Sequence, residues 1–334
     1  MSSYLPVTEF QQAHLVAWLR DLPAQTGMIN IRIDGVGDRK QLESAWREVA
    51  RARSVIRVRF RPRSSDFVQE LRTFDQLDPD FLSIGRDSSV PPSASPLSAT
   101  PFVLRASEDG AASLTFHHAF LDKTGAIGIV DDLRAAYAGR KLDSDQGRWT
   151  ESINFSIERM LEANPPQDPL LVSPGGRVAS ANVVQLALSS ELLSNIRAFA
   201  RHSSVSLAAY FIWKISRALE GCGLHRLLRI PMSYRDQNGL RFELRGLYSH
   251  VRALGRTGEF ASSDESGLAA AQSRLLELNR NRWNQPHGGL GLTALPVTVL
   301  SIHDEGEGET AARGMQYPNG DTPNTSTSMV PITF

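Results

Sequence analysis

The feature that most constrains this chain is a pair of adjacent histidines, His117 and His118, at the end of an apolar run. Before the pair, Leu114 and Phe116 share one face of a strand with His118, because side chains alternate along a strand with a period of two. A carboxylate, Asp122, follows four residues after the second histidine. The pattern predicts a strand that ends in a loop carrying two imidazoles and one carboxylate.

A helix is expected directly after this loop. Thr124 can cap its first turn, and Gly139 stands where a helix C-terminus favours glycine. The apolar positions at helical spacing are Ala126, Val130, Leu133 and Tyr137. A strand-to-helix loop is a usual place for chemistry on a rigid scaffold, and a histidine there can accept a proton near neutral pH. Asp122 could order the loop if it had a cationic partner.

Two other interpretations of the histidine pair are open on these residues alone. One is a buried, hydrogen-bonded pair with a structural role. The other is a metal site, but no third cluster of ligands lies at a fitting spacing in the sequence. We therefore expect no metal.

Composition sets outer limits on the kind of protein. The chain has 334 residues, enough for two lobes or domains with cores of their own. The formal net charge is zero, so nothing favours nucleic acid or an anionic membrane as a partner. The single cysteine, Cys222, excludes an internal disulfide, and no signal pattern opens the chain. Because no apolar run approaches the ~20 residues of a membrane helix, we expect a cytoplasmic protein.

Residues 1–163 are expected to form the first lobe. Thr8–Gln11 has the pattern of a capping box that opens a helix to about Leu19, and Asp38 can cap a second helix. Alternation at 29–33 and at 56–61 predicts two strands, the second with an arginine-rich face.

Residues 164–176 contain four prolines and two glycines without periodicity, and we interpret them as a linker. Residues 177–334 are then the second lobe, with one helix capped by Ser189 or Ser190 and two more that begin near Ser206 and Ser263. From about residue 304 the composition becomes poor in apolar residues, which indicates a long loop or a disordered tail.

The segment His117–Asp122 resembles the His-His-x-x-x-Asp-Gly signature of the condensation domains of non-ribosomal peptide synthetases. These domains belong to the superfamily of CoA-dependent acyltransferases that includes chloramphenicol acetyltransferase. Other family motifs are matched, in the family's order, by Leu5–Gln11 (Pro-x-(Ser/Thr)-x-x-Gln), Ile56–Arg57 (Leu-Arg), Pro231–Arg235 (Pro-Val-Ser-x-Arg) and Gly246–Val251 (Gly-x-Phe-Val-Asn). The resemblance covers most of the chain.

The resemblance implies an α/β (α+β) fold with two chloramphenicol acetyltransferase-like lobes, arranged in a V around a channel. It implies that His118 acts as general base or positioning residue, that His117 is structural, and that Arg57 pairs with Asp122. The residues that it makes candidates for lining the channel are Lys123, Tyr248, His250, Ser233 and Arg235.

The activity that the resemblance implies is transfer of a thioester-bound acyl or peptidyl group to an amine or hydroxyl acceptor in natural-product biosynthesis. No permanently bound cofactor is expected. The acyl group would arrive on the phosphopantetheine arm of an acyl or peptidyl carrier protein, or on CoA, and the other partner would be a small-molecule acceptor.

Three departures from the family pattern keep other functions open. Lys123 replaces the glycine after the aspartate, His250 replaces the asparagine of the second-lobe motif, and the C-terminal motifs of a full condensation domain have no counterpart. The chain could therefore be a degenerate or repurposed member that binds a carrier protein or a product, or that performs cyclisation or dehydration. A free acyl-CoA O-acyltransferase is a further alternative, because the superfamily shares the histidine motif.

Overall fold

A computed structural model of the chain separates into two compact units. The structure describes residues 3–20, 28–63, 66–78, 84–86, 95–98, 101–107, 110–163, 186–233, 244–280, 297–303, 315–316 and 327–333. The first unit comprises Met1–Arg159, Ser233–Ser249 and Gly308–Gly320. The second comprises Met160–Met232, His250–Glu307 and Asp321–Phe334.

The first unit is built on a five-stranded sheet with the strand order β12-β2-β7-β6-β5. Its strands are β2 (Met28–Ile33), β5 (Gly85–Arg86), β6 (Phe102–Ala106), β7 (Ala112–His117) and β12 (Met315–Gln316). The expected alternation is confirmed in β2, where Ile29, Ile31 and Ile33 are buried. Strand β7 lies between β2 and β6 and is antiparallel to both. The strand that ends at His117, directly before His118, is therefore central in its sheet.

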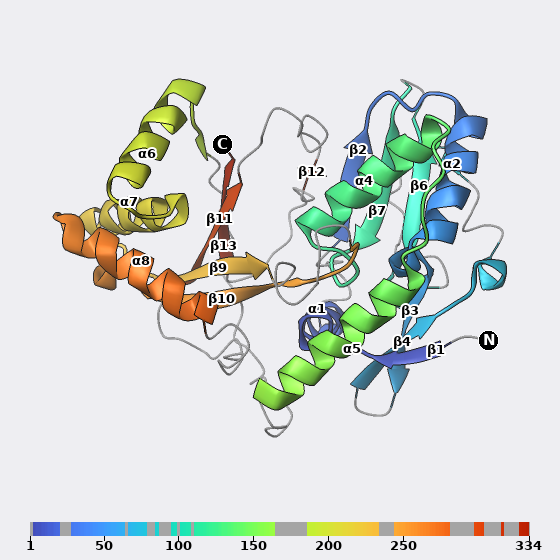
Figure 1. Ribbon diagram of the computed structural model, residues 1–334, viewed down its shortest axis with the longest axis horizontal. Coiled ribbons are helices and arrows are strands. Elements are labelled where there is room, and N and C mark those ends of the chain that lie inside the picture. The colour runs from blue at the N-terminus through green and yellow to red at the C-terminus, as the bar shows by residue number, and fades with distance from the viewer. Residues whose placement is uncertain are drawn as a thin grey trace. The chain divides into compact units, whose positions relative to one another are not determined.

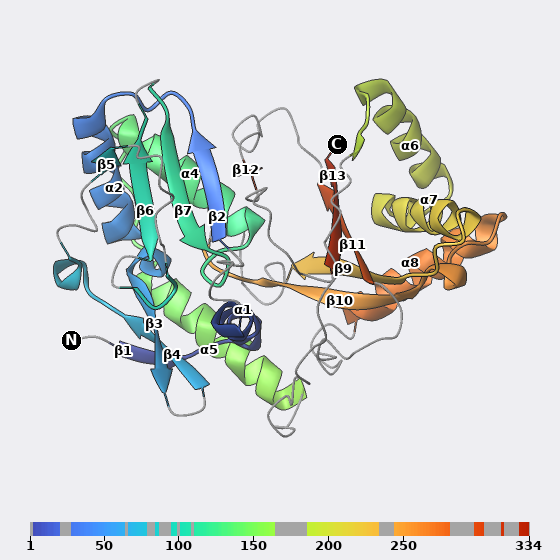
Figure 2. The ribbon, with the colours of Figure 1, turned by 180° about the vertical axis from the view of Figure 1, so that it is seen from behind.

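Two helices, α2 (Arg39–Ala52) and α4 (Lys123–Tyr137), cover one face of this sheet, as Figures 1 and 2 show from opposite sides. Helix α2 is capped by Asp38, as expected. Helix α4 is capped by Asp122 and not by Thr124, because the Asp122 side chain accepts the N–H of Gly125. At the other end of α4, Gly139 has a positive φ of 79°, a conformation that favours glycine.

The described part of the first unit also contains a three-stranded sheet, β1-β4-β3, and two further helices, the second of which runs past Arg159 into the second unit. These elements are β1 (Ser3–Pro6), α1 (Glu9–Arg20), β3 (Val58–Arg63), β4 (Asp66–Leu71) and α5 (Gln146–Ala163). The capping box of α1 is confirmed, since Thr8 and Gln11 exchange side-chain-to-backbone hydrogen bonds of 2.9 and 3.3 Å. The strand expected from residue 56 begins only at Val58, because Ser54–Arg57 forms the 3₁₀ turn η2.

In its described residues, the second unit has a five-stranded sheet of order β10-β9-β11-β13-β8 and three helices. Its strands are β8 (Leu186–Ala187), β9 (Leu227–Ser233), β10 (Ser249–Arg256), β11 (Val297–His303) and β13 (Thr327–Thr333), and its helices are α6 (Ser190–His202), α7 (Leu207–Gly221) and α8 (Glu265–Arg280). Ser206 caps α7, as expected, and of the two serines expected to cap α6, Ser189 and Ser190, it is Ser189 that does so. A core that includes Trp213, Phe260 and Leu268 lies among these elements.

The two units are not continuous in sequence, whereas the two expected lobes are. Residues Ser233–Ser249 and Gly308–Gly320 group with the first unit although they follow parts of the second in sequence. The expected linker, 164–176, lies outside the described residues. The region from about residue 304, expected to be a loop or a tail, contains the described strands β12 and β13. Among the described helices, none has both the length and the apolar character needed to cross a membrane.

Candidate functional site

His117, the last residue of β7, is buried in the first unit with 1% of its surface exposed. Its Nδ1 accepts the N–H of Ala119 at 3.1 Å, so the proton of the neutral ring is on Nε2. Its ring lies edge-on to that of Trp18, with centroids 6.4 Å apart. These contacts are those of a packing residue that fixes the turn after the strand.

His118 follows the strand and is half-buried. Its Nδ1 lies 2.8 Å from the carbonyl oxygen of Leu121. A carbonyl only accepts hydrogen bonds, so this contact requires the proton on Nδ1 and leaves the lone pair of the neutral ring on Nε2. The loop therefore selects the tautomer in which Nε2 is the proton acceptor.

His14 of α1 is a second imidazole at this site, and the sequence analysis did not identify it. Its ring centroid is 4.5 Å from that of His118, with an angle of 33° between the planes. The available signal was helical spacing, because His14 precedes the buried Trp18 by four residues. His14 thus belongs to the inward side of α1.

Asp122 is buried and orders the loop through backbone groups. Its carboxylate accepts the N–H of Gly125 at 2.8 Å and the N–H of Tyr248 at 3.0 Å. Its own N–H donates to the carbonyl of Gly246 at 3.2 Å. Asp122 therefore joins the start of α4 to a segment that is distant in sequence.

The expected ion pair between Arg57 and Asp122 is wrong. The Arg57 guanidinium donates to the carbonyls of Ala50, Arg51 and Arg72 at 3.0, 2.6 and 3.1 Å, and to the Gln146 side chain at 3.2 Å. Burial lowers the pKa of Arg57, and the charge of Asp145 opposes this effect. Arg57 lies in the 3₁₀ turn η2, and its donors are used on backbone carbonyls and on the side chains of Ser54 and Gln146.

Of the candidates for lining a channel, the structure describes three side chains. Lys123 is the first residue of α4 and is half-buried, and Ser233 ends β9 and is exposed. The assignment of Tyr248 is wrong, because its side chain is 1% exposed and its hydroxyl lies 2.6 Å from that of Ser152. Arg235 and the side chain of His250 lie outside the described residues; the backbone of His250 is in β10.

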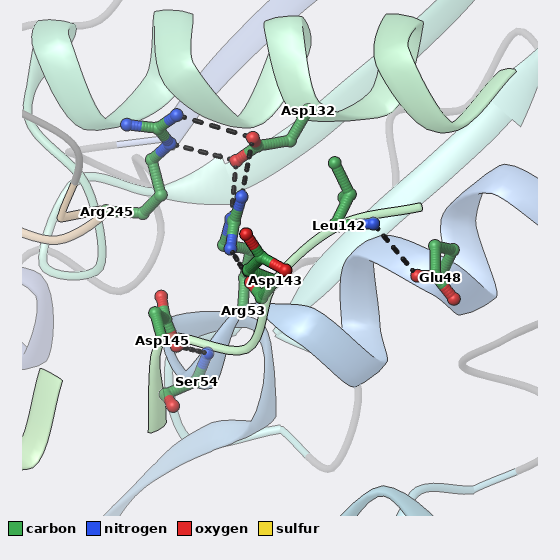
Figure 3. Close-up of polar contacts among 8 residues, drawn as sticks. All are labelled: Glu48, Arg53, Ser54, Asp132, Leu142, Asp143, Asp145 and Arg245. Atoms are coloured by element: carbon green, nitrogen blue, oxygen red, sulfur yellow. Dashed lines mark hydrogen bonds and ion pairs between the residues drawn. The ribbon is translucent and has the colours of Figure 1, made fainter. Parts of the chain in front are cut away.

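An Arg-Asp-Arg cluster centred on Asp132 of α4, shown in Figure 3, was also not expected from the sequence. Asp132 accepts two hydrogen bonds from Arg53, at 2.7 and 2.8 Å, and two from Arg245, at 2.9 and 3.3 Å. Burial acts to raise the pKa of Asp132, but the hydrogen bonds and charges of the two guanidinium groups lower it overall. Opposite charges in the sequence gave no sign of which residues would meet, because Asp132 lies 79 residues from Arg53 and 113 from Arg245.

In the described part of the chain, no group of three or more His, Cys, Asp or Glu side chains is arranged to hold a metal ion. The candidate site consists of the His118 ring, the adjacent His14 ring and the backbone contacts of Asp122.

No protein-family model matches the sequence, and no curated protein does so. Solved structures match it by fold. The first condensation domain of the calcium-dependent antibiotic synthetase, in complex with a substrate analogue, matches 90% of this chain and 80% of its own, with a TM-score of 0.61 and 15% identity. A mutant starter condensation domain of rhizomide synthetase, in complex with C8-CoA and Leu-SNAC, matches 90% and 78%, with a TM-score of 0.56 and 15% identity.

The X-domain from teicoplanin biosynthesis, in its complex with OxyB, matches 99% of this chain and 84% of its own, with a TM-score of 0.56 and 17% identity. At these identities the likeness concerns the fold. The chain has the mixed α/β fold of condensation domains, as the sequence predicted.

Proposed function

We propose that this protein catalyses condensation-type acyl transfer, with His118 as the general base or as the residue that positions the nucleophile. The observation that carries the proposal is the hydrogen bond from His118 Nδ1 to the carbonyl of Leu121, 2.8 Å long. It leaves Nε2 as the proton acceptor of a ring that is half-buried at the end of a central strand. A general base that acts through Nε2 requires this tautomer of the neutral ring.

The reaction follows from this geometry. Nε2 takes a proton from the amine or hydroxyl of the acceptor while the nitrogen or oxygen attacks the thioester carbonyl. The new C–N or C–O bond forms, the C–S bond breaks, and the thiolate leaves and takes up a proton. One well-placed base contributes ~10²–10⁴-fold to such a rate.

We propose a phosphopantetheine arm or CoA as the carrier of the donor. Support comes from the rhizomide synthetase domain, which was solved with a CoA thioester and an aminoacyl thioester analogue. The acceptor is an amine or a hydroxyl, since His118 Nε2 can take a proton from either group.

A second candidate function is binding of a partner protein without acyl transfer. The X-domain with this fold was solved in complex with another protein, OxyB. Lys123 favours this candidate as well, because it places an ammonium group at the first position of α4, directly after Asp122. A cation there opposes the helix dipole and brings a long side chain where the family has glycine.

The experiment is a single-turnover screen by mass spectrometry, with acyl-CoA and acyl-carrier donors against amine and alcohol acceptors. Wild type, His118→Ala and His202→Ala are compared, since His202 is an exposed imidazole near the end of α6 and controls for loss of a histidine. We expect product with wild type and His202→Ala, and a rate lower by ~10²-fold or more with His118→Ala. Equal rates in all three would remove His118 from the mechanism, and no product from any donor would favour the binding function.

A further inference from the structure

The segment Leu244–Tyr248, which we call the strap, is attached to α4 at two places. Near the middle of the helix, Arg245 binds Asp132 through two hydrogen bonds of 2.9 and 3.3 Å. At the start of the helix, the carbonyl of Gly246 and the N–H of Tyr248 bind Asp122 at 3.2 and 3.0 Å. All of these residues belong to the first unit. The strap is therefore fixed along α4 at both its charged residue and its backbone.

The attachment at Asp132 is a buried one. Side-chain exposure is 8% for Asp132, 14% for Arg245 and 12% for Arg53, which is the other partner of the same carboxylate. Both guanidinium groups bind the carboxylate through two nitrogens, as Figure 3 shows. Such bidentate pairs restrict orientation as well as distance. Arg245 is thus held in one position relative to α4.

Gly128 makes room for this contact on the surface of α4. A Cβ atom at Gly128 would lie 2.3 Å from the Arg245 Nε, closer than any real side-chain contact. The Arg245 side chain therefore crosses the helix where the helix has no side chain. On the other side of the strap, the Tyr248 hydroxyl lies 2.6 Å from that of Ser152 on α5.

One peptide group connects the strap to His118. The carbonyl of Leu121 accepts the hydrogen bond from His118 Nδ1, and the N–H of Asp122 donates to the carbonyl of Gly246. These two groups belong to the same planar peptide unit, so rotating one rotates the other. The orientation of the peptide that selects the His118 tautomer is thereby tied to the position of the strap.

We propose that Arg245 is a positioning residue for His118. By fixing the strap on Asp132, it holds the Leu121–Asp122 peptide in the orientation that keeps the proton on Nδ1 and the lone pair on Nε2. Arg53 binds the same carboxylate but contacts the carbonyl of Asp143 and not the strap. It should therefore contribute to stability without affecting His118. The positioning of His118 by Arg245 is supported by these contacts alone, whereas an effect of Arg245 on the rate of acyl transfer rests on the proposed function.

The test compares Arg245→Met with Arg53→Met, because each removes one guanidinium group and leaves Asp132 paired with the other. The first readout is the ¹⁵N chemical shifts of the His118 ring, which report the tautomer without any substrate. The second is kcat and KM for acyl transfer with a donor found in the screen. We expect Arg245→Met to give a mixture of tautomers and a kcat lower by ~10-fold or more with KM little changed, and Arg53→Met to keep both at wild-type values.

If Arg245→Met does not fold, Gly128→Ala takes its place, since the added Cβ displaces the Arg245 side chain and leaves all three charges present. Equal effects of the Arg245 and Arg53 variants, or an unchanged His118 tautomer in folded Arg245→Met or Gly128→Ala, would overturn the inference. A changed tautomer in a protein whose wild type transfers no acyl group would support the positioning and reject the proposed function. The two failures are therefore distinct.

Discussion

The imidazole of His14 lies against the imidazole of His118, with ring centroids 4.5 Å apart and planes inclined by 33°. His14 comes from α1, whose first turn is fixed by the capping box of Thr8 and Gln11. The Gln11 side chain donates in turn to that of Gln69 on β4, at 3.0 Å. The His118 ring is therefore held by its own loop at Nδ1 and by an independently anchored helix at its face.

Replacement of His14 separates packing from proton chemistry. His14→Phe keeps an aromatic ring against His118 and removes the ring nitrogens, whereas His14→Ala removes both. If His14 only positions His118, we expect His14→Phe to keep the rate of acyl transfer within about threefold of the wild-type rate. We expect His14→Ala to lower the rate by ~10-fold or more, because misplacement of a catalytic group by about 1 Å can cost as much as 10²-fold. Single-turnover rates of the three proteins check this.

The control for the two His14 variants is a double variant that also carries His118→Ala. His14→Ala combined with His118→Ala should be no slower than His118→Ala alone, because His14 would then have nothing to position. An equal loss in His14→Phe and His14→Ala would mean that the imidazole itself takes part in the reaction.

Asp122 allows a prediction about stability. Asp122→Ala removes the cap of α4, worth about 1 kcal/mol, and leaves the buried N–H of Tyr248 without its acceptor, worth about 1–3 kcal/mol. We therefore expect Asp122→Ala to lower the free energy of unfolding by about 2–4 kcal/mol. Asp122→Asn keeps one side-chain oxygen and should lose less. Urea unfolding of the three proteins measures both differences, and equal losses would show that the carboxylate matters only through its charge.

Much of the fold was predictable from local patterns. The caps at Thr8, Asp38 and Ser206 and the alternation in β2 were identified correctly, because each depends on neighbours within about four residues. At α6 the sequence left Ser189 and Ser190 as alternatives, and Ser189 is the cap. The cap of α4 was predicted wrongly, as Thr124 in place of Asp122, because two residues that can cap a helix stand close together there. The tertiary contact with Tyr248 favours Asp122 in that position.

The candidate site was only partly predictable, because its contacts are distant in sequence. Arg57 looked like one residue of an arginine-rich strand face or like the partner of Asp122, and the structure contradicts both. The 3₁₀ turn η2 delays the strand and turns Arg57 towards the carbonyls of α2. The meeting of Asp132 with Arg245, 113 residues away, leaves no local periodicity to detect.

A double-mutant cycle tests the corrected role of Arg57. Its contacts, with the carbonyls near the end of α2 and with Gln146, are not shared with Asp122. We expect Arg57→Met and Asp122→Asn to act additively on the free energy of unfolding, with a coupling energy under about 0.5 kcal/mol. The positive control is the cycle between Arg245→Met and Asp132→Asn, which are in direct contact. A coupling energy of several kcal/mol between positions 57 and 122 would support the ion pair that the resemblance implied.

The last prediction concerns Asp145, which precedes α5 and is 2% exposed. One carboxylate oxygen accepts the N–H of Ser54 at 2.8 Å, and the other has no hydrogen-bond partner among the residues that the structure describes. Burial raises the pKa of Asp145 above its ordinary value of 3.8, although the hydrogen bond from Ser54 and the charges of Arg53 and Arg57 act in the opposite direction. The carboxyl group of Asp145 therefore binds a proton more tightly in the folded protein than in the unfolded chain.

The sign of the pH dependence follows from this difference. A carboxyl group with a raised pKa in the folded state costs stability where it is ionised, above the folded pKa, and this cost disappears as the pH falls towards the unfolded value. Asp145→Asn removes the titration and keeps one oxygen for the N–H of Ser54. We expect the variant to be more stable than wild type at pH 7, and the difference to shrink as the pH falls to about 4, near the unfolded pKa of Asp. Urea unfolding of both proteins across this range measures it, with Asp143→Asn, an exposed neighbour, as the control for loss of one acidic group. A difference between wild type and Asp145→Asn that is constant with pH, or that grows on acidification, would show that the folded state does not raise the pKa of Asp145.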